Sequence, residues 1–276
     1  MPENSKNTPF LLYHYTTKNI LIEYIFEDYS LKIGSFKNTN DPKENKFSSL
    51  CMPIGHHNFV KAQNIFEHIR FNEWNVLCLT MDYESKDTAK IDNHLKDKFD
   101  SFNRGSAHAR MWSHYAENHT GVCLVLDGNA LFEGVNKCLS PGEEVYCGPI
   151  NYENVSSRDF KAYELVTTEA ELESITEENL QELIRNHVRR FYDQLFLTKF
   201  LDWSSENEYR FLINNIRPGN KYLSLEGALK KVILGSDFHP NYFPSVTSVC
   251  ERKNIPVYKV DWQNRWAGYY PIKSRL

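Results

Sequence analysis

The sequence predicts a single α+β domain. About seven or eight short apolar runs have the composition of strands, and segments with helical spacing lie between them. Residues 120–126, TGVCLVL, form an almost unbroken apolar run, which predicts a strand buried on both faces near the middle of a sheet. The chain contains no repeat, low-complexity tract or clear linker, so residues 1–276 are expected to form one domain.

The other elements follow from the spacing of apolar residues and from the turn residues between them. Residues 169–199 hold the longest helical pattern, and Ser174 and Glu177 fit a capping box at its start. Residues 1–9 are polar, which predicts a disordered end, and residues 82–105 are charged, which predicts an exposed insertion or a lid over a site. We expect further strands at 10–15, 31–33, 76–80, 143–150, 231–234 and 255–260, and one that ends at 213. Further helices are expected at 18–29, 57–71 and 106–116, and the segments 128–142 and 239–251 are expected to be helices or loops.

The composition narrows the range of partners. The formal net charge is −4, so no general attraction to nucleic acid or anionic lipid is expected. A nucleic-acid partner would need a local basic patch, such as Arg185, Arg189 and Arg190. The six cysteines are scattered without a CxxC pair, and neither a signal peptide nor an apolar run of membrane-spanning length is evident. These features predict a cytoplasmic protein with free thiols and no membrane partner.

Four polar groups of residues lie at the edges of predicted strands, where α+β folds commonly place ligand sites. Histidine, tyrosine and carboxylate side chains recur among them, and these can bind a ligand or take part in catalysis. The groups are His14-Tyr15-Thr16, Asn40-Asp41-Pro42 with Glu44, Trp112 with His114 and Tyr115, and Glu206 with Glu208 and Arg210.

Each group has a structural interpretation beside a functional one. His14 is either a half-buried histidine with one hydrogen bond or a donor that orients a ligand, because neutral imidazole gives one hydrogen bond and accepts another. The sequence Asn40-Asp41-Pro42 predicts a turn in the first place. In the functional interpretation, Asp41 and Glu44 also help to close a pocket.

Glu206 and Glu208 alternate, so a strand would direct both carboxylates to one face. Two carboxylates so close raise each other's pKa unless Arg210 or a substrate cation intervenes. They form either a solvated sheet edge or a pair in which one carboxylate stabilises a developing cation and the other orients it.

No metal site is predicted. His56, His57, His114 and His119 lack partners at the helical spacing of metal ligands. No Walker loop, GxGxxG or GxSxG is present, which removes the commonest nucleotide-binding and hydrolase interpretations.

The order of short motifs along the chain gives a further indication. The motifs are YHYTT (13–17), NDPKE (40–44), LCLTMD (77–82), WSHYAENHTGVCLVLD (112–127), WSSENEYRF (203–211) and VILGSDF (232–238). Together they resemble a widespread bacterial family of uncharacterised proteins with the pattern HYT…NDPxE…WxxYAxxHxGVCLxFD…ExEYR, and the resemblance spans residues 10–238. That family distantly resembles the ADP-ribosyltransferase superfamily, alongside the toxin DarT, whose first strand also carries a His and a Thr.

The resemblance to ADP-ribosyltransferases implies split sheets with NAD⁺ in the cleft and a triad of the His-Tyr-Glu type. His14 would hold the ribose on the nicotinamide side, and Glu208 would stabilise an oxocarbenium-like transition state as the catalytic glutamate. Tyr115 or Trp112 would stack on the nicotinamide, and Glu206 would orient the acceptor. The expected cofactor-binding set is completed by Tyr15, Thr16, Asn40, Asp41 and Arg210.

Three functions are therefore compatible with the sequence. The first is an NAD-consuming ADP-ribosyltransferase or NAD glycohydrolase that acts as a bacterial toxin or anti-phage defence effector, with a protein, a nucleic acid or water as the acceptor. The second is a non-catalytic nucleotide or nucleic-acid binding module in a defence or stress system, in which Trp112 and Tyr115 stack a base. The third is a nuclease with Mg²⁺ held by Asp41, Glu44, Glu206 and Glu208, although no D/E-x-K pattern lies on a strand pair.

Overall fold

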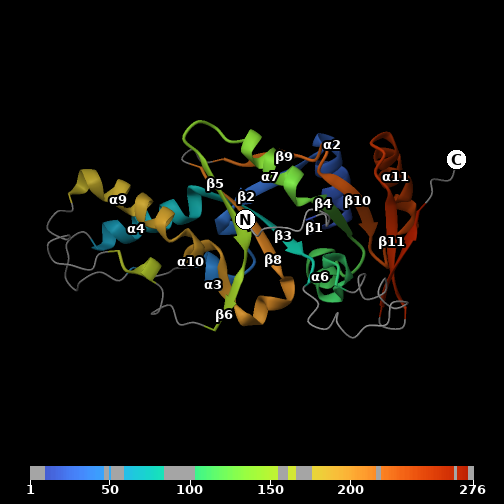
Figure 1. Cartoon of the computed structure of the whole chain (residues 1–276), viewed down its shortest axis with the longest axis horizontal. Coiled ribbons are helices and arrows are strands. Elements are labelled where there is room, and N and C mark those ends of the chain that lie inside the picture. Colours follow the sequence, from blue (N-terminus) through green and yellow to red (C-terminus); the bar gives the residue numbers. More distant parts are fainter. Residues whose placement is uncertain are drawn as a thin grey trace.

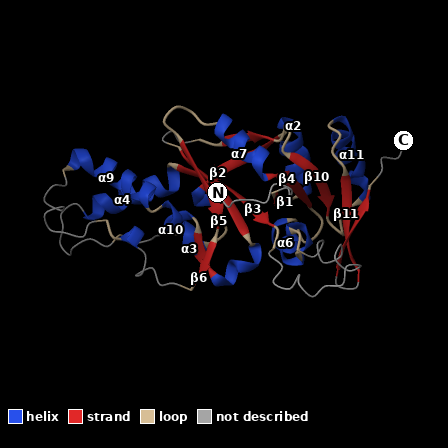
Figure 2. Ribbon diagram, viewed as in Figure 1, coloured by secondary structure: helices blue, strands red, loops and turns tan. Residues whose placement is uncertain are grey.

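The chain is an α+β fold in which helices flank one large mixed sheet (Figures 1 and 2). Helices α4 (Phe59–Asn72) and α9 (Glu177–Arg190) lie at one end of the long axis, and α11 (Phe243–Arg252) lies at the opposite end (Figure 1). The computed structural model describes residues 10–46, 50, 59–83, 103–154, 161–165, 176–215, 219–263 and 266–272. The predicted disordered end at 1–9 and most of the predicted lid, residues 84–102, lie outside the described residues.

In the part of the chain that the structure describes, the large sheet contains ten strands, and β4 lies between β1 and β10 with its first five residues buried. The prediction of a central strand at 120–126 is thus confirmed. Among the described strands of this sheet, all pairs are antiparallel except β10 with β11. The order is β12 (Trp266–Pro271), β11 (Val257–Gln263), β10 (Leu229–Leu234), β4 (Val122–Asp127), β1 (Leu11–Thr16), β3 (Trp74–Met81), β2 (Ser30–Ser35) and β9 (Lys221–Ser224), while β8 (Glu208–Asn214) pairs with β3 and β5 (Glu144–Pro149) pairs with β8.

Two strands share one edge of β3, and this arrangement splits the sheet. On that edge, β1 pairs only with residues 80–81 of β3, and β2 pairs only with residues 75–76. On the opposite edge, β8 pairs with β3 from Trp74 to Thr80. Between these two short pairings, residues 77–79 of β3 pair with neither β1 nor β2. The two strands diverge there and leave a gap in the sheet.

The helices agree with most of the predicted positions. The helix predicted at 18–29 comprises α1 (Lys18–Ile20), a π-helical stretch η1 (Leu21–Ile25) and α2 (Phe26–Asp28), and it ends at Tyr29 with a left-handed φ of 47°. The helix predicted at 57–71 is α4, and α6 (Ala109–Tyr115) lies inside the helix predicted at 106–116. α7 (Gly128–Lys137) and α11 overlap the segments 128–142 and 239–251, which were predicted as helix or loop. α3 (Pro42–Asn45) was not predicted as a helix, because Asn40-Asp41-Pro42 was interpreted as a turn.

One helix prediction is wrong. In place of a single helix over 169–199, α9 and α10 (Tyr192–Phe196) are separated at Phe191, whose backbone leaves the helical region at φ −111° and ψ 28°. The capping box is also displaced. Thr176 accepts a hydrogen bond from the N–H of Asn179, whose side chain accepts one from the N–H of Thr176, so the helix begins two residues later than Ser174 predicts. Residues 169–175 lie outside the described part of the chain.

Several short strands were not predicted. Among them, β6 (Asn151–Glu153) and β7 (Thr198–Phe200) form a separate parallel pair beside the main sheet. β9 and β12 were also missed. A three-residue strand is shorter than the window in which alternation can be recognised, and β7 follows directly on a strong helical pattern.

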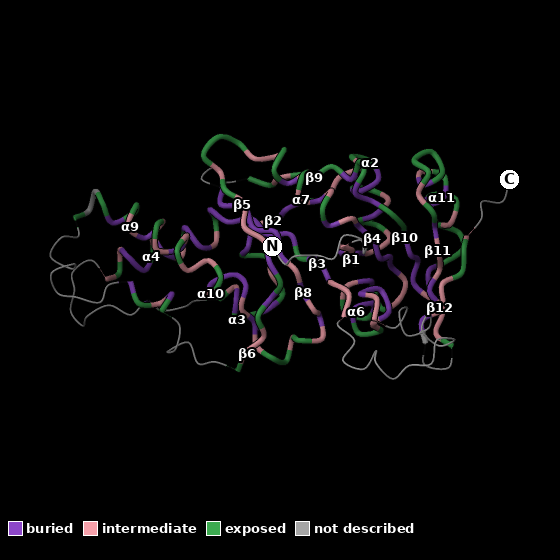
Figure 3. The backbone as a smooth tube through the Cα atoms, viewed as in Figure 1, coloured by how far each residue is buried: buried purple, intermediate pink, exposed green. Residues whose placement is uncertain are grey.

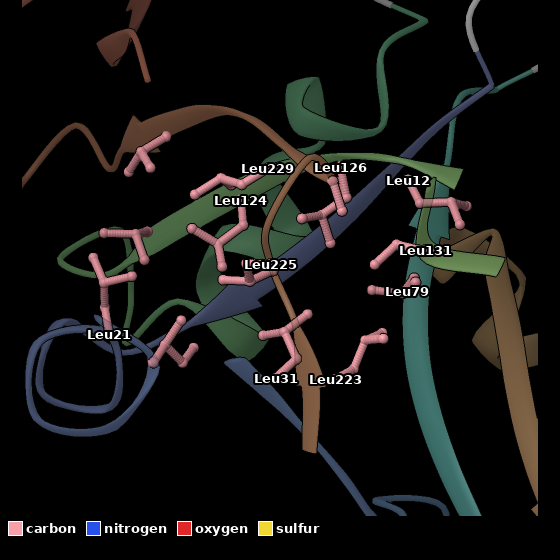
Figure 4. Close-up of a cluster of buried hydrophobic side chains, with 14 of the residues drawn as sticks. Leu12, Leu21, Leu31, Leu79, Leu124, Leu126, Leu131, Leu223, Leu225 and Leu229 are labelled. Carbon is pink, nitrogen blue, oxygen red and sulfur yellow. The ribbon is translucent and has the colours of Figure 1, made fainter. Parts of the chain in front are cut away.

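The two faces of the sheet are covered differently. One face carries a continuous apolar cluster, to which β1, β3, β4, β8 and β10 contribute alternate residues and α2, α7 and α11 contribute their buried faces. The close-up in Figure 4 shows ten leucines of this cluster, among them Leu12, Leu79 and Leu124 on three adjacent strands. The opposite face carries two separate clusters, one around Trp74 with α4, α9 and α10, and one around Trp112 with β1 and β4. Figure 3 shows the buried backbone running through the middle of the molecule.

A tight turn fixes the end of α6 against β4 and β10. Glu117, Asn118 and His119 have left-handed φ values of 50°, 50° and 69°. The turn returns the chain to Gly121, whose carbonyl accepts a hydrogen bond of 2.9 Å from the N–H of Gly235. A Cβ atom on Gly235 would lie 2.0 Å from the carbonyl oxygen of His119, so only glycine permits this approach of two backbones.

We predict that Gly235→Ala destabilises the fold by about 1–3 kcal/mol or more, because the added methyl group meets backbone rather than a movable side chain. Gly219→Ala is the matched control, since a Cβ there meets nothing within 4 Å. Urea unfolding of both variants measures the difference. Equal stability of the two variants would contradict the close approach at Gly235.

Candidate functional site

A cavity of about 220 Å³ lies where the sheet splits. β3 and β8 form one side of it, β1 and the end of α6 form another, and the loop 38–40 closes a third. Its charged side chains, those of Lys199, Glu206, Glu208 and Arg210, are buried, whereas Asn38 and Asn40 are exposed. The predicted site residues that line it are His14, Tyr15, Asn40, Tyr115, Glu206, Glu208 and Arg210.

Arg210 is the centre of a buried ionic network. Its guanidinium, which is 0% exposed, donates to both carboxylate oxygens of Glu44 at 2.7 and 2.9 Å and to both oxygens of Glu208 at 2.6 and 3.1 Å. It also donates to the carbonyl of Phe196 at 2.7 Å. Arg210 therefore joins β8 to α3 and α10. These contacts engage the guanidinium with carboxylates, and Arg210 also lines the cavity, so its expected role as a cofactor ligand stays a prediction.

Glu206 and Glu208 converge on Lys199, although they do not share a strand. Glu206 ends a 3₁₀ helix (Leu201–Glu206), and Asn207 then turns the chain with a left-handed φ of 43° into β8. The expectation that both glutamates alternate along a strand is thus wrong. Lys199 donates to Glu206 Oε2 at 2.7 Å and to Glu208 Oε2 at 3.0 Å.

Glu208 is held as an ionised carboxylate. Burial raises its pKa, but the Arg210 guanidinium and the Lys199 ammonium outweigh that effect and hold the pKa at about 2. The thiol of Cys78 on β3 also donates to this carboxylate. Glu208 is therefore charged throughout the physiological pH range.

His14 spans the gap between the diverging strands. Its ring hydrogen-bonds the backbone of Cys78, within the segment of β3 that faces the gap. Burial lowers the pKa of His14 to about 4, although this hydrogen bond opposes the shift. The imidazole is therefore neutral at pH 7, so it offers polar contacts to a ligand without adding positive charge.

Tyr115 joins α6 to the network. Its hydroxyl donates to Glu206 Oε1, and its side chain also hydrogen-bonds Asn40 in the opposite loop. Burial and the Glu206 carboxylate raise the pKa of Tyr115 well above its usual value, so the hydroxyl stays protonated. The predicted position of Tyr115, at a helix end beside the site, is confirmed.

A second cavity, also of about 220 Å³, adjoins the first across Tyr115 and Glu206. Arg110, His114 and Trp203 line it together with Asp202 and Ser205. Tyr115 and Glu206, which share a hydrogen bond, therefore line both cavities.

Three expected ligands lie elsewhere. Trp112 is 0% exposed, donates through Nε1 to the carbonyl of Ser106 and packs edge-on against Tyr15, so neither a nicotinamide nor a base can stack on it. Asp41 is the N-cap of α3 and accepts a hydrogen bond from the N–H of Lys43, as its turn interpretation predicts. Thr16 is buried at the end of β1 and does not line the cavity.

One residue of the network, Lys199, was not assigned a role in the site from the sequence alone. Lys199 lies in a largely apolar stretch, where a lysine requires a buried partner, and that contrast was the available signal. Glu44 was predicted to help close a pocket or to hold Mg²⁺, but its pairing with Arg210 spans 166 residues and depends on the fold. Among the described residues, no group of three His, Cys, Asp or Glu side chains could hold a metal ion, and no helix is long and apolar enough to cross a membrane.

We predict that Arg210→Met lowers the free energy of unfolding by about 3–5 kcal/mol, because Glu44 and Glu208 would keep buried charge without a partner. Arg189→Met is the control, since the Arg189–Glu144 pair is solvent-accessible and its loss costs about 0–1 kcal/mol. Urea unfolding compares the two variants. Losses of the same size would show that the buried clamp contributes no more than a surface pair.

Comparison with known proteins agrees with the predicted likeness to an uncharacterised family. Residues 111–211 match the model of a family described as protein of unknown function (DUF2971). No curated protein and no solved structure is significantly similar to the chain. The part of the chain that resembles this family includes Tyr115, Lys199, Glu206, Glu208 and Arg210.

Proposed function

We propose that the cavity binds the nicotinamide–ribose end of NAD⁺ and that the protein is an ADP-ribosyltransferase or NAD glycohydrolase. The observation that carries this proposal is a fixed, ionised carboxylate, Glu208, in the same cavity as the neutral imidazole of His14, where the sheet splits. A site with a buried, preoriented negative charge is suited to a reaction that develops positive charge.

The charge of the network supports a cationic ligand. When Glu44, Glu206 and Glu208 are all ionised, they share two cations, Lys199 and Arg210, so these five groups carry one excess negative charge. Burial raises the pKa of Glu44, and the charges of Arg210 and Lys199 oppose that shift. The nicotinamide ring of NAD⁺ is a cation, and the sugar becomes one when the glycosidic bond breaks. The cavity is smaller than the roughly 300–1,000 Å³ of typical ligand pockets, which suits one end of a dinucleotide.

The reaction follows from this arrangement. The bond between the nicotinamide nitrogen and ribose C1′ breaks, and its electron pair leaves with nicotinamide, which becomes neutral. The oxocarbenium-like ribose that remains is stabilised by Glu208. An acceptor then forms a bond to C1′ and loses a proton. In this proposal the acceptor is water, a protein side chain or a nucleic acid, and it approaches from the side of Glu206.

The biological setting in the proposal is that of a bacterial toxin or anti-phage defence effector. The distant resemblance to the branch that includes DarT supports this setting. Nuclease chemistry fits the geometry less well, because Asp41 caps a helix and each of the three network carboxylates already binds Lys199 or Arg210.

We predict that Glu208→Gln lowers the rate of nicotinamide release from NAD⁺ by about 100- to 1,000-fold, the range for loss of one preoriented electrostatic group. Glutamine preserves the shape of the side chain, and circular dichroism and thermal unfolding verify that the variant folds. Glu143→Gln is the control, since Glu143 pairs with Lys221 away from the cavity. Wild-type turnover by the Glu208→Gln variant would refute the proposed role.

A second outcome separates catalysis from binding. If NAD⁺ raises the melting temperature of the wild-type protein and no nicotinamide is released with water, lysate protein or nucleic acid as acceptor, the cavity is a binding module. The Tyr115 ring, which lines the cavity, would then be the residue whose removal abolishes the thermal shift.

We also predict that kcat/KM for NAD⁺ stays constant from pH 7 down to about pH 5 and falls near pH 4. Protonation of His14, whose pKa is about 4, adds a positive charge beside the developing cation, whereas Glu208 stays ionised until about pH 2. The pH–rate profile measures this fall, its acid limb, and the acid limb should be absent in the His14→Asn variant. A limb near pH 6.5 in the wild-type protein would show that His14 titrates as an exposed histidine.

A further inference from the structure

Lys199 reaches the cavity from outside the main sheet. It lies on β7, whose only partner among the described strands is β6, and its side chain is 4% exposed. Its ammonium group lies between two carboxylates, 2.7 Å from Glu206 and 3.0 Å from Glu208. The Trp203 ring covers the ammonium at 4.9 Å from the ring centroid. These contacts hold the charge of Lys199 at one point between the two glutamates.

The two carboxylates would repel each other without this cation. Oxygens that both lie within 3.0 Å of one nitrogen are close neighbours, and two like charges at such a distance favour protonation of one of them. Burial strengthens the effect because water screens it little.

We propose that Lys199 is a positioning residue that keeps Glu206 and Glu208 ionised together, so that each performs a separate step. This inference rests on the proposed function. Glu208 faces the developing cation, while Glu206 lies between the two cavities and hydrogen-bonds Tyr115. In the second half of the reaction, the acceptor forms its bond to C1′ and its proton passes to Glu206. Glu208 keeps its charge until that bond has formed.

None of the surrounding titratable groups takes the place of Lys199 as the cation between Glu206 and Glu208. The other titratable groups near the two carboxylates are Glu44 on α3, Cys78 on β3, Tyr115 on α6, Tyr152 on β6 and Arg210 on β8, together with Tyr83 near Glu206 and with Arg110, His114 and Asp202, which line the second cavity beside Glu206. Two of these groups are arginines. Arg210 contacts Glu208 and Glu44 but not Glu206, and Arg110 donates to Ser205 Oγ at 2.9 Å. His14 lines the same cavity and is neutral above about pH 4. Burial lowers the pKa of Lys199, but the nearby carboxylates, Glu208 first, raise it well above its usual value, so the ammonium stays charged.

The first test is the pH–rate profile of nicotinamide release by Lys199→Met. We expect its acid limb to lie about one pH unit or more above that of the wild-type protein, because one of the two glutamates now protonates more readily. Lys221→Met is the matched control. Lys221 also forms a largely buried ion pair, with Glu143 at 2.6 Å, but lies away from the cavity, so its loss should leave the acid limb unchanged. An unshifted limb in Lys199→Met would overturn the proposal.

The double variant Lys199→Met/Glu206→Gln tests whether the shift of the acid limb is reversed. It removes the cation and one of the two repelling charges, so the acid limb should return to within about half a pH unit of the wild-type position. The double variant is also expected to fold if Lys199→Met alone does not. A limb that stays displaced, or a double variant that unfolds as readily as the single one, would show that Lys199 has a packing role instead.

Thermal unfolding without NAD⁺ separates this inference from the proposed function. In the wild-type protein the pKa of Glu208 lies below its unfolded value, so its contribution to stability is present above about pH 4.5 and is lost as the pH falls toward 2. In Lys199→Met one carboxylate pKa is raised above its unfolded value, so that group stabilises the fold only at low pH. The melting temperature deficit of Lys199→Met should therefore be larger at pH 8 than at pH 4.5. An equal deficit at both pH values would overturn the role of Lys199, whereas absence of nicotinamide release would overturn only the NAD⁺ activity.

Discussion

The buried guanidinium of Arg210 is the constraint on which the site depends. A charged group in the interior is tolerated only when its donors are satisfied, and here two carboxylates and a backbone carbonyl satisfy them. Those acceptors come from β8, α3 and α10. The polar network then extends through Lys199 and Glu206 to Tyr115 on α6. Tyr115, Lys199, Glu206, Glu208 and Arg210 of this network line the cavity.

Local sequence patterns predicted the parts of the site that local structure determines. The apolar run at 120–126 places β4 in the sheet interior, and the helical spacing up to Tyr115 places that tyrosine at a helix end. In both cases the placement depends on a single element, so an apolar run or helical spacing is sufficient to predict it. For His14 the sequence left two interpretations open, a half-buried histidine with one hydrogen bond and a donor that orients a ligand.

The sequence was less informative where placement depends on several elements. Trp112 and Tyr115 share a helix, but the packing of α6 on β1 buries the tryptophan and leaves the tyrosine at the cavity. Glu206 precedes its strand because Asn207 adopts a left-handed turn, which a polar residue allows but does not require. Lys199 depends on a three-residue strand outside the main sheet. None of these outcomes has a periodic signal in the sequence.

The excess negative charge of the network has a consequence for the oxidation state of the ligand that we propose. The nicotinamide ring is positively charged in NAD⁺ and uncharged in NADH, while the rest of the molecule is the same. Inside a cavity that water screens poorly, a fixed negative charge attracts the first ring and gains little from the second. Reduced cofactor would therefore be a weak competitor, and occupancy of the site would follow the concentration of the oxidised form.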